Sequence, residues 1–108
     1  APASVTSLGQ NRAHLTGAIY GQEPASMLPP EALRAAVIQS VVADSGGLRV
    51  LDLCAAPGSK STQLGAWLER SGAPGCHLLV ANEPDPSRAD VLRANLLRGG
   101  VSCFLLTR

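Results

Sequence analysis

The chain has 108 residues and a formal net charge of +1, and 45% of its residues are hydrophobic while 16% are charged. These values are typical of one globular domain and exclude a disordered or fibrous chain. No window reaches the ~18 consecutive apolar residues of a membrane span. Near-zero charge and only 3% aromatic residues argue against a strongly electrostatic or base-stacking grip on nucleic acid by this segment alone.

The N-terminus and the cysteines both bear on the cellular location of the protein. The first residues lack the basic start and apolar run of a secretory signal, so residues 1–16 are predicted to be a flexible lead-in. The three cysteines, Cys54, Cys76 and Cys103, are too widely and irregularly spaced for a disulfide framework or a zinc site. We therefore expect no metal and a reducing, non-secreted compartment, either the cytoplasm or a nuclear or organellar matrix.

The next part of the chain is predicted to be a loop followed by a helix. The stretch Gly17–Leu28 carries turn signals at Gly21 and Pro24 and reads as loop. A helix is then expected to begin at Pro29 and Pro30, which a first helical turn tolerates, and to end at Gly46 and Gly47. Its apolar positions are Leu33, Val37, Val41 and Val42.

The remainder alternates between strands and helices. This alternation predicts the βαβαβ half of a doubly wound α/β fold, with the strands in the spatial order 3-2-1. The outer edge of the first strand then has no partner within the chain, and an open apolar edge promotes aggregation. We expect another segment of the same protein, or a partner chain, to complete the sheet there. The predicted strands are 49–54, 77–83 and 101–107, and the predicted helices are 59–70 and 86–98.

The turn after the first strand, within "VLDLCAAPGSKSTQL", has the composition of a ligand-binding loop. Alanines and Gly58 let the backbone approach a ligand closely, and helix-start amides favour an anion. A Walker loop is excluded because Ser59 precedes Lys60, and the pattern G-x-G-x-x-G of dinucleotide sites is absent. An ordinary strand-to-helix turn remains the alternative for the loop.

A carboxylate further along narrows the choice of ligand. Glu83 ends the second strand and follows Gly58 at about the offset (~20 residues) at which an acid meets ribose hydroxyls in nucleotide-binding folds. A ribose without a 2′-phosphate and an anionic tail describe S-adenosylmethionine. A solvated acid at the end of a strand is the alternative for Glu83 alone.

Three blocks of the sequence carry a family resemblance. "LDLCAAPGSKSTQL" resembles motif I of the Sun-family RNA (cytosine-5) methyltransferases, whose signature reads D-x-C/A-A-A-P-G-G/S-K-T. "LTGAIYGQEPASMLPP" resembles the segment before that motif, and "LVANEPDPSRADVLRANLLRGGVS" resembles the motif II region, closest to bacterial 16S ribosomal RNA enzymes of the RsmF type. The resemblance runs in collinear order from about His14 to the last residue.

The resemblance implies a Rossmann-like class I methyltransferase fold, of which residues 17–108 are a partial S-adenosylmethionine-binding domain. It also implies a supporting role near the site for Gln22 and Glu23, and methyl transfer to C5 of a cytosine in RNA, most of which is bound by regions outside this chain. The residues that it assigns to the cofactor are Cys54, Ala55, Ala56, Pro57, Gly58, Ser59, Lys60 and Glu83.

The family pattern continues into motifs that this sequence does not contain. They include an aspartate near the adenine, a D-A-P-C motif and a second cysteine motif, so no catalytic residue is expected here. Cys54 is interpreted as structural, since the family tolerates alanine at its position. Three interpretations stay open: the binding portion of an enzyme, an inactive structural subunit of a larger, ribosome-associated assembly, or a methyltransferase fold with another substrate. The lone histidine His77 is given no role, and Arg88, Arg93 and Arg98 are interpreted as the solvated face of a helix.

Overall fold

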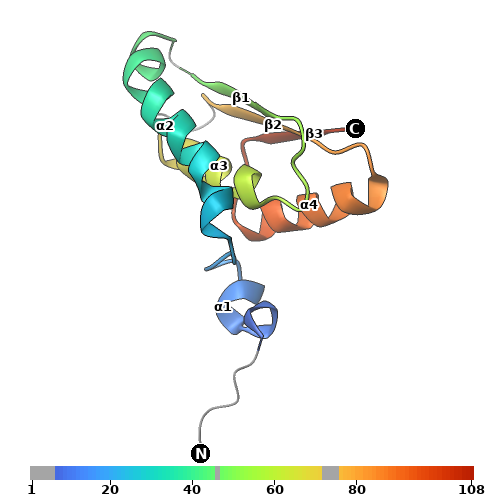
Figure 1. Cartoon of the computed structure of the whole chain (residues 1–108). Helices are drawn as coiled ribbons and strands as arrows, with labels where there is room; N and C mark the ends of the chain where they lie inside the picture. The colour runs from blue at the N-terminus through green and yellow to red at the C-terminus, as the bar shows by residue number, and fades with distance from the viewer. Residues whose placement is uncertain (1–6, 46, 72–75) are drawn as a thin grey trace, which may run out of the picture.

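The computed structural model describes residues 7–45, 47–71 and 76–108, leaving aside the side chains of 38–45. Three parallel strands form one sheet in the order β1-β2-β3 (Figure 1). They are β1 (Arg49–Asp52), β2 (Leu78–Asn82) and β3 (Phe104–Thr107). The predicted α/β class and strand order are confirmed, and β1 lies at an edge of the sheet, as expected.

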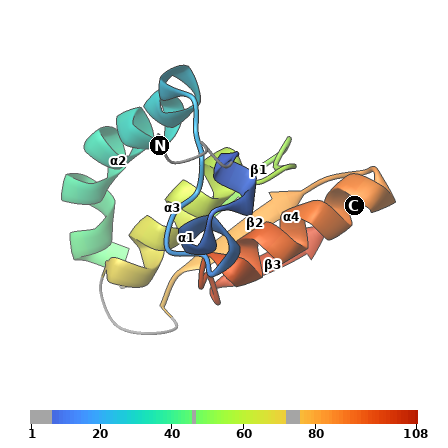
Figure 2. The same cartoon turned by 90° about the horizontal axis from the view of Figure 1, so that it is seen from below.

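Two helices connect the strands as right-handed crossovers require. They are α3 (Ser59–Arg70) and α4 (Pro86–Arg98), and both lie on the same side of the sheet (Figures 1 and 2). The strands are shorter than predicted at their ends. The Val101 N–H donates to the Leu96 carbonyl at 3.0 Å, so Val101 is still part of the C-terminal cap of α4. Strand β3 therefore begins only at Phe104.

The core lies between the sheet and these two helices. Val50 and Leu79 are buried partners on neighbouring strands, and Ala81 lies two residues further along β2 on the same face. Leu68 from α3 and Leu92 from α4 pack against them, with exposed fractions of 1% and 0%.

The opposite face of the sheet is bare as far as the described residues are concerned. The cross-strand row Leu51, Val80 and Leu105 lies there, and Leu51 and Leu105 are 57% and 54% exposed. A continuous apolar run such as Arg49–Cys54 is typical of a parallel strand buried on both faces, but Leu51 is exposed here because α3 and α4 cover the other face.

The helix before β1 begins earlier than predicted. α2 spans Pro24–Ser45, so Pro29 and Pro30 lie inside it rather than in its first turn. A proline inside a helix costs about 3 kcal/mol, but contacts with α3 hold this first part in place. The Ser26 and Ser59 hydroxyls are 2.7 Å apart, and Gln63 Nε2 donates to the Met27 carbonyl at 3.2 Å.

Two short helices, η1 (Leu8–Gln10) and α1 (Arg12–Leu15), occupy the described part of the predicted lead-in. Its flexibility and the domain boundary at residue 17 stay predictions. Residues 1–6, Gly46 and the side chains of Val41 and Val42 lie outside the described set. No helix in the described ranges has the length and apolar character needed to cross a membrane.

Candidate functional site

The loop between β1 and α3 makes a turn that needs glycine. Gly58 is the N-cap of α3 with φ of 113°, a left-handed conformation that other residues rarely adopt. A Cβ at this position would lie 3.2 Å from the Leu92 Cδ1 atom of α4. The loop is therefore closely packed against α4 on one side.

The first turn of α3 presents backbone donors that are unpaired within the described part of the chain. Thr62 is the first residue whose N–H is bonded back, to the Gly58 carbonyl at 2.8 Å. Within the described ranges no acceptor is recorded for the N–H groups of Gly58, Ser59, Lys60 and Ser61. Such a group of amides at the N-terminus of a helix favours a small anion, such as a carboxylate.

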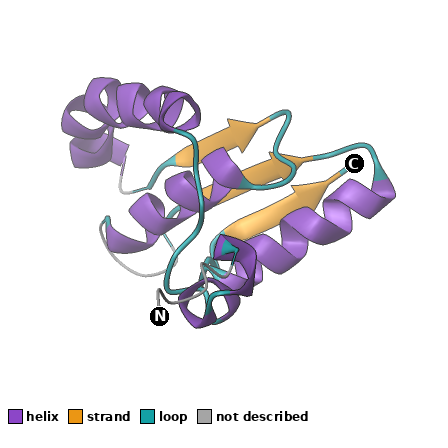
Figure 3. Cartoon of the chain, turned by 60° about the horizontal axis from the view of Figure 1, so that its bottom comes forward, coloured by secondary structure: helices purple, strands orange, loops and turns teal. Residues whose placement is uncertain are grey.

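Glu83 lies at the same end of the sheet as this loop. The loops after β1 and β2 emerge side by side in Figure 3, and the Ala55 N–H donates to the Asn82 carbonyl at 3.1 Å. Glu83 directly follows β2 and is only 5% exposed. Its Oε1 atom accepts a 3.2 Å hydrogen bond from the Asp85 N–H, which leaves further acceptor capacity on the carboxylate.

Two side chains of helix α4 donate hydrogen bonds to the loop between β1 and α3. Arg88 donates to the Ala56 carbonyl at 3.2 Å, and Asn95 Nδ2 donates to the Pro57 carbonyl at 2.7 Å. Arg88 is exposed, as interpreted from the sequence, yet its guanidinium also reaches the loop. The signal available in the sequence was the spacing of Arg88 and Asn95, seven residues apart, on one helix face.

Asp52 is a site residue that sequence reasoning missed. Its Oδ2 atom accepts a 2.7 Å hydrogen bond from the Ser61 hydroxyl, and its Oδ1 atom accepts one from the Cys54 N–H at 3.3 Å. The carboxylate thus ties the end of β1 to the first turn of α3. An acid that interrupts an apolar strand just before a loop was the available signal.

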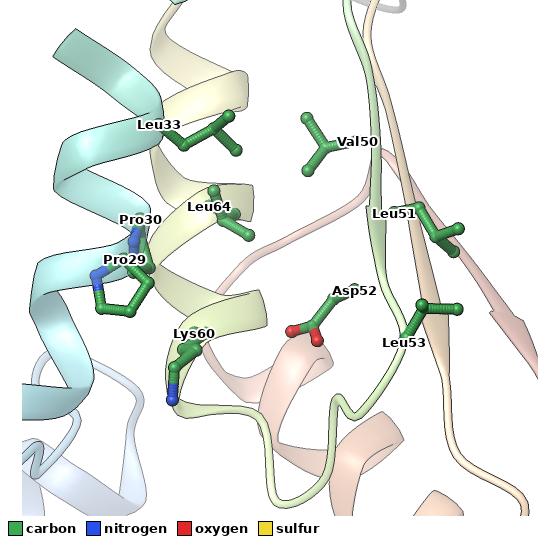
Figure 4. A pocket seen from close by; sticks show the side chains of 9 residues that line it. All are labelled: Pro29, Pro30, Leu33, Val50, Leu51, Asp52, Leu53, Lys60 and Leu64. Carbon is green, nitrogen blue, oxygen red and sulfur yellow. The ribbon is translucent and has the colours of Figure 1, made fainter. Parts of the chain in front are cut away.

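Lys60 lines a different space from Glu83. A cavity of about 220 Å³ lies between α2 and the open side of β1 (Figure 4). Lys60 and Asp52 lie at one end of it, and Glu83 is not among its lining residues. Lys60 and Asp52 thus line the same cavity from opposite sides, Lys60 from α3 and Asp52 from β1. The lining residues are Pro29, Pro30, Leu33, Val50, Leu51, Asp52, Leu53, Lys60 and Leu64.

Some of the remaining predicted site residues pack in the core, and others support the start of α3. Ala55 and Ala56 are buried in the core, whereas Cys54 and Pro57 are exposed. Gln22 Nε2 donates to the Ser59 carbonyl at 2.5 Å, so Gln22 supports the start of α3, while Glu23 is exposed.

The three cysteines are free thiols. Burial and the neighbouring Glu69 carboxylate raise the pKa of Cys103 to about 11, so its thiol is protonated at neutral pH. A reducing compartment stays a prediction. In the described ranges, no group of three or more His, Cys, Asp or Glu side chains is arranged to hold a metal ion.

Comparisons with known proteins extend over nearly the whole chain. The chain is 46% identical, over 104 residues, to a ribosomal RNA small subunit methyltransferase F from Shewanella sediminis, covering 96% of the chain and 20% of that protein. The namesake from Shewanella loihica is 46% identical over 100 residues, which are 93% of the chain and 19% of that protein. No protein-family model matches the chain.

Solved structures show the same fold. NSun6 from Pyrococcus horikoshii with SFG superposes with a TM-score of 0.71 at 25% identity, over 94% of this chain and 23% of that chain. A methyltransferase homologue from Pyrococcus horikoshii gives a TM-score of 0.71 at 33% identity, over 94% and 29%. The chain spans about a fifth of the length of its curated relatives. As the motifs predict, it is thus similar, nearly from end to end, to part of a ribosomal RNA methyltransferase of the Sun family.

Proposed function

We propose that this chain is the S-adenosylmethionine-binding portion of an RNA methyltransferase that methylates C5 of a cytosine in ribosomal RNA. The proposal rests on two features at one end of the sheet: the amides of Gly58–Ser61, which have no recorded acceptor within the described ranges, and the buried carboxylate of Glu83. The names of the Shewanella relatives, and the SFG in the NSun6 structure, an analogue of S-adenosylmethionine, support it.

The residues present fit this cofactor. The carboxylate of Glu83 can accept hydrogen bonds from both ribose hydroxyls, and its charge disfavours a ribose phosphate. The amides of the first turn of α3 can bind the carboxylate of the methionine tail. Bound S-adenosylmethionine would supply the methyl group. This chain binds and orients the cofactor, and the family resemblance assigns it no nucleophile. Cys54 contributes its backbone N–H, which donates to Asp52 Oδ1 at 3.3 Å.

The open edge of β1 is where we expect the sheet to be completed. Among the described residues β1 pairs only with β2, and the apolar cavity beside Leu33 and Leu64 runs along its free edge. An extended segment added there would pair with the free backbone groups and cover the cavity. We propose that the remaining part of the domain, or a partner chain, supplies that segment, together with most of the RNA-binding surface.

Methyl transfer in the full-length protein tests the proposal. The purified protein is incubated with labelled S-adenosylmethionine and unmodified small-subunit ribosomal RNA, and the modified base is identified by nucleoside mass spectrometry. We expect 5-methylcytidine, with a rate at subsaturating cofactor that falls 10-fold or more in Glu83→Ala. A folded protein that binds ribosomal particles yet transfers no methyl group would support the alternative, an inactive structural subunit of a ribosome-associated assembly.

A further inference from the structure

One face of α4 is directed at the cofactor loop. Arg88, Leu92 and Asn95 follow one another at spacings of four and three residues, which places them on a single helical stripe. Arg88 and Asn95 donate to consecutive carbonyls of the loop, and Leu92 fills the space beside Gly58. The stripe therefore contacts the loop at three successive residues.

The hydrogen bond from Asn95 fixes the direction of one peptide plane. Asn95 Nδ2 lies 2.7 Å from the Pro57 carbonyl oxygen. In a trans peptide the N–H of the next residue points away from that oxygen. The Gly58 N–H is consequently turned away from α4, and within the described ranges no acceptor is recorded for it.

Packing prevents the loop from turning the other way. Gly58 and Leu92 are both buried, and the left-handed conformation at Gly58 brings the backbone close to the Leu92 side chain. Buried backbone donors are nearly always paired, so an N–H held in this direction is suited to a ligand acceptor. Arg88 adds a second, longer bond on the preceding carbonyl.

We infer that Asn95 is a positioning residue for cofactor binding, with Arg88 in a supporting part. Asn95 holds the Pro57–Gly58 peptide so that the Gly58 N–H joins the amides of α3 in facing the carboxylate of the methionine tail. This inference rests on the proposed function, since it concerns the same loop. It assigns to α4 a role in ligand recognition that the motif residues alone do not indicate.

Two ligands separate positioning from simple stabilisation. S-Adenosylmethionine carries the amino-acid tail, whereas 5′-deoxy-5′-methylthioadenosine keeps the adenine and ribose but lacks the tail. Calorimetric titration of the full-length protein compares both ligands in the wild type, Asn95→Asp and Asn95→Ala. Arg93→Ala, on an exposed position of α4, is the matched control.

The Asn95 variants should bind S-adenosylmethionine about 5-fold to 10-fold more weakly, since one donor to the loop is lost. Their affinity for methylthioadenosine and their melting temperature should match those of Arg93→Ala. Equal weakening of both ligands, or unchanged affinity for both, would overturn the positioning role while leaving the proposed function intact. A folded wild type that binds neither ligand would overturn both.

Discussion

The two faces of the sheet have similar apolar composition and very different surroundings. On one face Leu79 and Ala81 are fully buried under α3 and α4. On the other face Leu51 and Leu105 are more than half exposed. A doubly wound sheet carries helices on both of its faces, so the sequence of β1 is adapted to a more complete fold than the described residues form.

The covered face also carries the polar ties between helices and sheet. His77, before β2, accepts a 3.0 Å hydrogen bond from the Leu48 N–H through Nδ1, and its Nε2 contacts the carbonyl of Ser71 at the end of α3. Glu69 of α3 accepts bonds from Ser102 and Cys103 just before β3. Stability should therefore depend on residues of the covered face and scarcely on those of the bare face.

The largest effect should come from the core. Leu79→Ala should lower the free energy of unfolding by about 3 kcal/mol, because it leaves a cavity under the helices. Leu105→Ala, in the neighbouring strand but 54% exposed, should change it by less than about 0.5 kcal/mol. Urea unfolding followed by circular dichroism measures both, and equal losses would mean that the bare face is covered in solution.

Removing the histidine tie should have the next largest effect. His77→Ala leaves the buried Leu48 N–H and the Ser71 carbonyl without their partner, so we expect a loss of about 2 kcal/mol. Arg93→Ala, on the exposed side of α4, is the control with little expected change. If the two variants unfold at the same urea concentration, the histidine is not part of the tie between α3 and the sheet.

The Glu69 tie should make stability depend on acid. Three hydrogen bonds from Ser102 and Cys103 lower the pKa of Glu69 to about 2. Because the folded pKa lies below the unfolded value, the stabilisation is complete above about pH 4.5 and is lost as the pH falls toward 2. Glu69 is exposed, so solvent screening limits the effect to about 1 kcal/mol.

Glu69→Gln removes this titration. Its urea midpoint should approach that of the wild type as the pH falls from neutrality to about pH 2, whereas the wild type should be the more stable at neutral pH. A difference that stays constant across this range would show that the carboxylate does not contribute through its charge.

The smallest predicted effect concerns Lys60. Its side chain lines the cavity beside Asp52 rather than the space next to Glu83. Lys60→Ala should weaken S-adenosylmethionine binding only about twofold to fivefold, as expected for an exposed charge. A loss as large as that of a Glu83 variant would mean that the lysine contacts the cofactor directly.

The sequence predicted the elements well and their surroundings less well. The spacing of apolar residues and the positions of glycines predicted α3 and α4, because these helices depend on local sequence pattern. The order of the strands followed from the right-handedness of the crossovers. The predicted start of α2 was wrong, because its first turn is held by contacts with Ser59 and Gln63 of α3 that lie far away in the sequence. Motif residues predicted the loop and Glu83 as the cofactor site, and this stays a prediction. The contacts of Asp52, Arg88 and Asn95 could not be predicted, because only the folded chain brings these residues to the loop.

The central claim is that the α3 amides and Glu83 form one cofactor site, and calorimetric titration with S-adenosylmethionine tests it most directly. The wild type should bind, and Glu83→Ala should bind about 1–3 kcal/mol more weakly, because ribose hydroxyls lose their acceptor. Glu83→Gln, which keeps one acceptor, should lie between them. Equal affinity in all three, or no binding by a protein shown to be folded, would contradict the claim.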